Sequence, residues 1–140
     1  MLKTLHPLLT GRLLAILADM GHGNEIAIGD ANFGAANLAT RLVELPGAST
    51  DDILEAILSL LPLDDFSDAP LAVMKGPAGT EAMYEGFARI AERAEGRAVG
   101  MEVIEPAEFV ARTARAYAVV SSGERQLYGN IILRKGVVRP

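Results

Sequence analysis

Hydrophobic residues occur along this chain at two spacings, one typical of helices and one typical of buried strands. Helical spacing, with apolar residues three and four positions apart, recurs in several segments. Three of these segments begin next to a residue that favours the start of a helix. These residues are Thr10 for the first segment, Ser49 or Thr50 for the second, and Pro106 for the last. The predicted helices cover residues 11–20, the segment from 50 to the proline at 62, residues 80–95, and the segment that begins at Pro106.

Short apolar runs separate these helices and predict strands. The runs cover residues 25–29, 41–45, 70–75, 97–105, 117–121 and 130–134. Strands that alternate with helices need crossover connections, which give a mostly parallel sheet with helices on both faces. We therefore predict a single α/β domain over residues 1–140, with three layers in the order α/β/α. No repeat, low-complexity segment or linker indicates a second domain.

The composition narrows the range of partners. The sequence has 13 basic and 18 acidic residues and a formal net charge of −5, which argues against a surface for the phosphate backbone of nucleic acid. It has no cysteine and 2 histidines, so we expect no disulfide and no dedicated metal site. The apolar run at residues 13–18 is far shorter than the about 20 residues of a membrane-spanning helix. We expect a soluble, cytoplasmic protein that contacts neither nucleic acid nor membrane.

The stretch MGHGNEIAIGDANFG, residues 20–34, has the layout of a functional site. His22 lies between two glycines where a helix pattern stops, and we expect Gly21 to adopt the left-handed conformation that ends the helix. Asp30 follows the predicted strand, which spans about 17 Å if fully extended. Asp30 therefore meets His22 only if the loops curl together or a second subunit brings another copy close. The alternative is a solvated or capping histidine and an aspartate that caps the next segment.

A second informative stretch, residues 121–130, connects two predicted strands and is long for a hairpin loop. It mixes a phenol, an amide and charged groups with two glycines. Tyr128 and Asn130 could present hydrogen-bonding groups to a hydroxyl-rich ligand. Equally, Tyr128 could be a half-buried anchor and Asn130 could satisfy backbone groups at the strand entrance, so both interpretations stay open.

Other polar segments predict ordinary loops. The glycine-rich segment 76–79 lies between a strand and a helix, but it lacks the lysine and spacing of a phosphate loop, so we expect a plain turn. Asp64, Asp65 and Asp68 lack the glycine and the terminal glutamate of a calcium loop, so we expect a solvated acidic loop. His6 is expected to be a surface or packing residue.

Three sequence blocks carry a resemblance to a known family: MLKTLHPLL at the start, MGHGNEI followed by GDANF, and SSGERQLYGNIILRKGV near the end. With these blocks and their separation, the chain resembles the family of L-fucose mutarotases and D-ribose pyranases, which interconvert the cyclic forms of free monosaccharides. The resemblance spans nearly the whole chain. The last block, with Glu124, Arg125, Tyr128, Gly129 and Asn130, is more similar to the fucose branch than to the ribose branch.

The resemblance implies roles for individual residues. His22 matches the catalytic histidine of the family, a proton donor, and Asp30 matches its sugar-binding aspartate. Tyr128, Gly129 and Asn130 match its substrate-contacting triplet. Two positions depart from the fucose pattern: Asn32 replaces a histidine, and Pro106 falls where an arginine or histidine contacts the sugar. These departures affect the identity of the sugar more than the chemistry.

The chemistry that the resemblance implies suits these residue types. Anomer exchange removes a proton from the anomeric hydroxyl, delivers one to the ring oxygen, and then recloses the ring with these roles reversed. No redox or carbanion step is involved, so general acid and base groups suffice without metal or cofactor. Histidine can take either role near neutral pH. We expect His22 and Tyr128 to be catalytic, with Tyr128 assisting or orienting the second proton, while Asp30 and Asn130 hold sugar hydroxyls.

The resemblance also implies assembly, since family members are ring-shaped homo-oligomers, often decamers, with sites near subunit boundaries. Leu2, Leu5, Leu8 and Leu9 are candidate interface residues, although they could equally pack internally. The predicted function is a monosaccharide mutarotase, most closely one for L-fucose. The alternatives are a D-ribose pyranase, a mutarotase for another sugar, and a non-catalytic sugar-binding protein.

Overall fold

The computed structural model describes residues 1–140 and contains five helices and six strands. In chain order they are α1 (Gly11–Asp19), β1 (Glu25–Gly29), α2 (Ala35–Leu38), β2 (Leu42–Leu45), α3 (Thr50–Leu58), β3 (Leu71–Met74), α4 (Glu81–Glu95), β4 (Met101–Ile104), α5 (Pro106–Arg115), β5 (Ala118–Ser122) and β6 (Ile131–Arg134). Thr10 and Ser49 cap α1 and α3, because their hydroxyls accept the Leu13 and Asp52 backbone N–H groups. Both caps agree with the sequence prediction.

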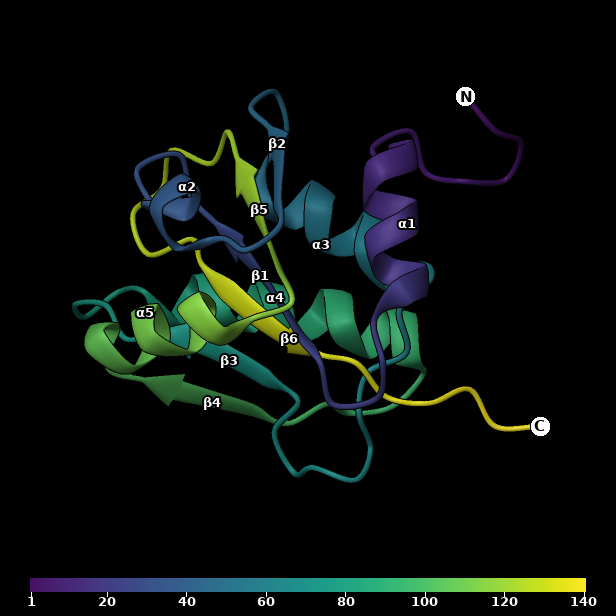
Figure 1. The fold of residues 1–140 in the computed structure, drawn as a ribbon. Helices are drawn as coiled ribbons and strands as arrows, with labels where there is room; N and C mark the ends of the chain where they lie inside the picture. The colour runs from purple at the N-terminus through teal and green to yellow at the C-terminus, as the bar shows by residue number, and fades with distance from the viewer.

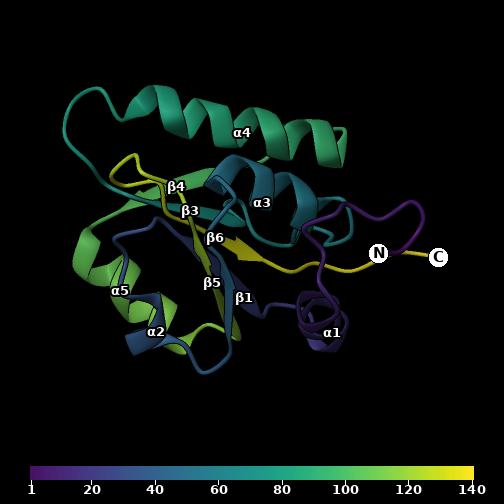
Figure 2. The ribbon, with the colours of Figure 1, turned by 90° about the horizontal axis from the view of Figure 1, so that it is seen from above.

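The six strands form one sheet in the order β2-β5-β1-β6-β3-β4 (Figure 1). All neighbouring pairs are parallel except those of β6, which is antiparallel to both β1 and β3. Figure 2 shows α3 and α4 on one side of the sheet and α2 and α5 on the other. The predicted three-layer α/β/α arrangement with a mostly parallel sheet is therefore confirmed.

Alternate strand residues face two separate cores, as the two-residue period of a strand requires. On one face, Ile26 and Ile28 of β1 join a large core with apolar residues of α1, α3 and α4. On the other face, Ala27 joins a smaller core with residues of α2 and α5, including Phe109. Because both faces of the central strands are covered, β1, β3, β5 and β6 are almost continuously apolar.

The polar loops lie at two opposite edges of the sheet, one at each end of the central strands, and the direction of each strand decides which loop lies where. Asp30 follows β1 and Met74 ends β3, while Asn130 precedes the antiparallel β6, so these three residues lie at one edge. His22 precedes β1 and lies at the opposite edge, where β6 ends at Arg134. The straight-strand geometry expected from the sequence is thus retained, and the loops do not curl together within the chain.

One helix end and one short helix differ from the prediction. Gly21 was expected in the left-handed conformation, but Gly23 has it instead, with φ of 84°. The reason is that Met20 leaves α1 in an extended conformation, and the Asn24 side chain then accepts the Gly21 N–H at 2.7 Å. The short helix α2 was not predicted, because its four residues give no helical period.

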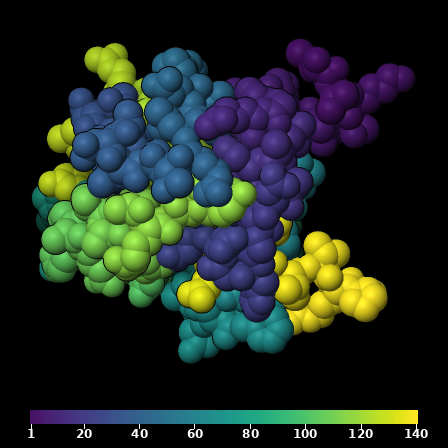
Figure 3. Space-filling view, in the orientation of Figure 1, coloured from purple at the N-terminus to yellow at the C-terminus, as the bar shows by residue number.

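The N-terminal leucines mostly pack internally. Leu5 and Leu8 contact the large core and Leu9 is buried, whereas Leu2 keeps 63% of its surface exposed. Figure 3 shows the two terminal segments protruding from the same side of the molecule. The longest helix, α4, has 15 residues, and no helix has both the length and the apolar character needed to cross a bilayer.

Candidate functional site

Asp30 and Asn130 meet at the edge formed by the ends of β1 and β3 and the start of β6. The Asp30 backbone N–H donates to the Asn130 side-chain oxygen at 2.7 Å, and both residues are buried. The Asn130 amide nitrogen lies 3.8 Å from the Met74 sulfur, and an Asp30 carboxylate oxygen accepts the Asn32 N–H at 2.8 Å. Two residues that distant sequence blocks predicted as site residues are therefore brought into contact, through the Asp30 backbone and the Asn130 side chain.

A pocket of about 230 Å³ opens over this contact. It is lined by Asp30, Asn32, Phe33, Met74, Leu127, Tyr128 and Asn130. Carboxylate, amide and phenol groups supply hydrogen bonds, whereas Phe33 and Met74 supply an apolar wall. A small ligand with hydroxyl groups on an apolar ring fits this mixture of surfaces.

Tyr128 is held in an unusual backbone conformation, with φ of 66°. This left-handed region is costly for a residue with a side chain, and such strain persists where surrounding contacts impose it. The Asn130 N–H donates to the Tyr128 carbonyl at 2.7 Å, and the buried Thr50 hydroxyl donates to the Gly129 carbonyl at 2.8 Å. The loop that carries the phenol is thus fixed from β6 and from the start of α3.

Glycines around the pocket leave room for its side chains. A Cβ atom on Gly76 would lie 3.0 Å from the Tyr128 ring and 2.5 Å from the Thr80 hydroxyl. A Cβ atom on Gly129 would lie 2.7 Å from Glu124 Cγ. Gly129 therefore has a steric role in the loop, in addition to the substrate contact that the resemblance implies.

His22 does not line this pocket. Its Nε2 atom lies 3.0 Å from Asp64 Oδ1, and its ring packs against the Phe66 ring with centroids 5.1 Å apart. The His22 side chain is 44% exposed, whereas that of Asp64 is only 4% exposed. The chain therefore carries the histidine and the pocket at opposite edges of its sheet.

Asp64 is a buried carboxylate with several partners. Burial by itself raises its pKa, but hydrogen bonds from His22 and the Phe66 N–H, with the charges of His22 and Arg134, hold the pKa below its ordinary value. The Arg134 Nε atom lies 3.4 Å from the second carboxylate oxygen. Asp64 is thus ionised at neutral pH.

The prediction of a solvated acidic loop is wrong for Asp64, because this residue is buried. It holds for Asp65 and Asp68, which are exposed. Asp64 and His22 are 42 residues apart, so no local spacing links them.

No group of three or more histidine, aspartate or glutamate side chains converges to hold a metal ion. The segment 76–79 forms the expected turn, and the Gly76 and Gly79 N–H groups donate to Tyr84 and Glu81.

The two positions that depart from the fucose pattern differ in location. Asn32 lines the pocket, where its side chain can contact a ligand. Pro106 occupies the first turn of α5 and does not line the pocket. Of the two, Asn32 is the one placed to affect which ligand is accepted.

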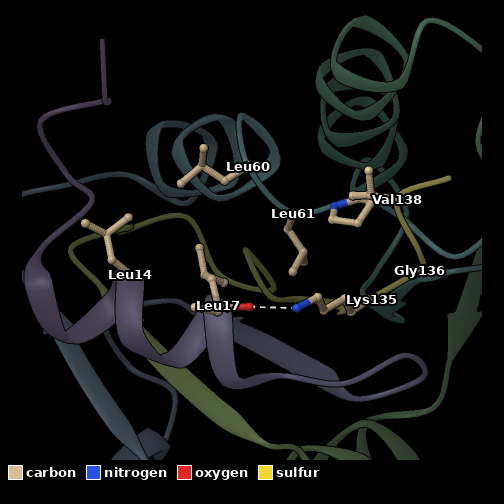
Figure 4. Close-up of a pocket in the computed structure, with 9 residues that line it drawn as sticks. Leu14, Leu17, Leu60, Leu61, Lys135, Gly136 and Val138 are labelled. Atoms are coloured by element: carbon tan, nitrogen blue, oxygen red, sulfur yellow. Dashed lines mark hydrogen bonds between the residues drawn. The ribbon is translucent and has the colours of Figure 1, made fainter. Parts of the chain in front are cut away.

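A larger cavity of about 580 Å³ lies between α1, the end of α3 and the C-terminal segment (Figure 4). Its walls are mainly apolar, with Leu14 and Leu17 on one side and Leu60 and Leu61 on the other. The Lys135 ammonium donates to the Leu17 carbonyl at 2.8 Å and also to the Met20 carbonyl, where it stabilises the C-terminus of α1. This cavity presents no free acid or base group, so the smaller pocket is the candidate site.

The profile of the RbsD / FucU transport protein family matches residues 3–138. An L-fucose mutarotase of Haemophilus influenzae is 42% identical over 140 residues, covering 98% of this chain and 97% of that protein. An L-fucose mutarotase of Glaesserella parasuis is 41% identical, covering 98% of this chain and 96% of that protein.

Solved structures with the same fold include two with bound sugars. The fucose mutarotase from Streptococcus pneumoniae in complex with L-fucose has a TM-score of 0.91 and 34% identity, covering 99% of this chain and 100% of that one. RbsD from Bacillus subtilis complexed with D-ribose has a TM-score of 0.73 and 25% identity, covering 96% of this chain and 98% of that one.

Proposed function

The chain belongs to the RbsD / FucU transport protein family, and on that premise we propose that it is a mutarotase that interconverts the α and β anomers of L-fucose. The observation that carries the proposal is the pocket, where Asp30, Tyr128 and Asn130 converge at the edge of the sheet. The fold is similar to that of a fucose mutarotase structure with bound L-fucose. The greater similarity to the fucose mutarotase than to RbsD supports L-fucose over D-ribose.

In the proposed reaction, the Asp30 carboxylate and the Asn130 amide hold sugar hydroxyls, and Phe33 and Met74 face the apolar side of the ring. A base removes the anomeric proton, a carbonyl forms, and the ring oxygen leaves with the bonding electrons and takes a proton. The aldehyde then rotates and recloses with the roles reversed. We assign these proton transfers to His22 and Tyr128.

His22 must come from a second subunit to act at this pocket. His22 precedes β1 and Asp30 follows β1. A strand of this length spans about 17 Å, which separates the two residues within one chain. Phe66 beside His22 and Leu127 at the pocket are 69% and 61% exposed, and each would be covered if the two edges met. Contact between unlike edges is head-to-tail, and such contacts close into rings when the rotation permits. We expect a ring-shaped homo-oligomer with ten subunits, located in the cytoplasm.

Exchange NMR on the anomeric protons tests the function directly. The protein is added to L-fucose, D-ribose or D-galactose, and magnetisation transfer between α and β signals is measured. We expect L-fucose to exchange faster, and the variant His22→Ala to lose on the order of 10²–10⁴-fold of this rate. His6→Ala, which changes the other histidine, is the matched control and should keep the rate.

Two outcomes would change the proposal. Faster exchange of D-ribose or D-galactose alone would move the substrate to another sugar, with Asn32 as the first pocket residue to substitute. Line broadening without faster exchange for any sugar would replace the enzyme by a non-catalytic sugar-binding protein.

A further inference from the structure

Two buried hydroxyl groups, those of Thr50 and Ser122, lie against the loop that carries Tyr128. Thr50 is the first residue of α3 and Ser122 is the last residue of β5, and neither lines the pocket. Thr50 is 0% exposed and Ser122 is 3% exposed. A hydroxyl that is buried so completely needs hydrogen-bond partners, and both hydroxyls find them in backbone carbonyls next to pocket residues.

Each hydroxyl has one proton to donate, and the distances show where each proton goes. Thr50 Oγ1 donates to the Gly129 carbonyl at 2.8 Å, and Ser122 Oγ donates to the Gly29 carbonyl at 2.7 Å. The two hydroxyl oxygens lie 3.4 Å apart, but both protons are then already in use. Ser122 Oγ also accepts the Glu124 N–H at 3.1 Å. Ser122 therefore holds the start of the loop, and Thr50 holds its end.

The bond from Thr50 fixes one peptide unit that joins two residues of the site. The carbonyl of the unit between Gly129 and Asn130 accepts the Thr50 proton. The N–H of the same unit donates to the Tyr128 carbonyl at 2.7 Å. Because the peptide unit is planar, partners at both of its polar groups fix its orientation. No other hydrogen bond from outside the loop reaches the backbone of residues 127–129, so Thr50 anchors this end of the loop.

The Tyr128 phenol depends on this anchor more than the Asn130 amide does. The amide has its own contacts, since its oxygen accepts the Asp30 N–H at 2.7 Å and its nitrogen lies 3.8 Å from the Met74 sulfur. The phenol has no hydrogen bond within the chain, so its place follows from the backbone and from the close approach of its ring to Gly76. The Tyr128 φ of 66° is costly and persists only while surrounding contacts impose it.

We propose that Thr50 is a positioning residue, whose hydroxyl holds the Tyr128 phenol at the pocket by fixing the peptide unit between Gly129 and Asn130. It serves the proton transfer assigned to Tyr128. In that transfer the phenol gives its proton to the ring oxygen as the ring C–O bond breaks, while His22 takes the anomeric proton. Both protons return when the ring recloses. This inference rests on the proposed function, although the anchoring of the loop does not depend on sugar.

The first test is hydrogen–deuterium exchange of the full chain without sugar, measured by mass spectrometry. Thr50→Val leaves the Gly129 carbonyl without its partner, so amides of the loop 123–130 should exchange on the order of tenfold faster. Thr50→Ser keeps the hydroxyl and should keep native exchange. Thr113→Val is the matched control, since Thr113 is also 0% exposed and donates to a backbone carbonyl, that of Phe109, at 2.8 Å, but within α5.

The second test measures kcat and KM separately for the sugar that the native protein turns over. Thr50→Val should lower kcat by about ten- to a hundredfold, because the phenol is no longer held in place for proton transfer. KM should stay within about twofold of the native value, since Asp30 and Asn130 keep their mutual contact. Thr50→Ser should restore kcat, and Thr113→Val should leave both constants unchanged. Thermal unfolding identifies a valine variant that fails to fold, and Thr50→Ala then replaces Thr50→Val.

The outcomes separate this inference from the proposed function. Native loop exchange or native kcat in folded Thr50→Val overturns the positioning role, and so does an equal loss of kcat in Thr113→Val or in Thr50→Ser. If the loop exchanges faster in Thr50→Val but the native protein turns over no sugar, the anchoring of the loop stands and the mutarotase assignment fails. If Tyr128→Phe retains full activity, the role of Thr50 in catalysis falls together with that of Tyr128.

Discussion

Two tyrosines near the pocket are placed differently although both are partly buried. The Tyr84 hydroxyl donates to the Met74 carbonyl at 2.7 Å and accepts the Gly76 N–H at 2.9 Å, so it is engaged in the fold both as a donor and as an acceptor. The Tyr128 hydroxyl makes no hydrogen bond within the subunit, although its backbone is held in a strained conformation. A phenol that is positioned at such a cost but left free is suited to act on a ligand.

We therefore expect opposite effects from removing these two hydroxyls. Tyr128→Phe should keep the free energy of unfolding within about 0.5 kcal/mol of the native value and strongly reduce anomer exchange. Tyr84→Phe should lower the free energy of unfolding by roughly 1–3 kcal/mol, because the Gly76 N–H loses its partner. Urea titration and exchange NMR on both variants measure the contrast. Native exchange in Tyr128→Phe would rule out a proton-transfer role for that hydroxyl.

The sequence identifies the residues of the pocket better than it identifies the surroundings of His22. Asp30, Tyr128 and Asn130 carry recognisable motifs, and the ends of the strands that they flank follow from the apolar runs. Asp64 carries no such signal, because its loop reads as a polar connection and its burial depends on packing against β6. Long-range pairing of this kind has no local pattern, so only the structure reveals it.

Elements with clear periodicity were predicted well, and those defined by tertiary contacts were not. The strand β1 and the helices α1, α3, α4 and α5 lie close to their predicted positions. The helix α2 is too short to give a period, and β4 covers only Met101–Ile104 of the predicted run 97–105. The position of β6 between β1 and β3 follows from side-chain packing on both faces and not from its own sequence.

The end of β6 lies close to the loop that carries Asp64, and Gly136 makes this approach possible. A Cβ atom there would lie 2.5 Å from the Leu63 carbonyl oxygen and 2.8 Å from Asp64 Cα, both of which are backbone atoms. The Gly136 N–H also donates to the Pro62 carbonyl at 2.8 Å. A side chain at this position must therefore displace the loop.

Gly136→Ala should lower the free energy of unfolding by about 1–3 kcal/mol, because overpacking against backbone cannot be relieved by a change of rotamer. It should also slow anomer exchange by shifting Asp64 away from His22. Gly47→Ala is the matched control, since a Cβ atom at Gly47 meets nothing within 4 Å. Chemical denaturation of the two variants, followed by exchange NMR, measures both effects. Equal stability of the two would contradict the close approach.

In the whole molecule, the two halves of the proposed site lie on opposite edges of one sheet. The chain carries His22 at one edge and the pocket with Tyr128 at the other. A subunit in a head-to-tail ring would therefore give its histidine to one neighbour and receive a histidine from the other. Light scattering should give the mass of an oligomer, and a mass of 14.8 kDa would contradict the assembly.

Mixed rings test whether the site is shared. His22→Ala and Tyr128→Phe subunits should each be nearly inactive alone. When they assemble together at random in equal amounts, about one quarter of the boundaries should join a native Tyr128 pocket to a native His22 from the neighbour, so activity should return. If His22 acted within its own subunit, every site would lack one of the two groups and no activity would return. Co-expression with two different affinity tags isolates the mixed rings, and rings that are mixed but inactive would place His22 and Tyr128 in one subunit's site.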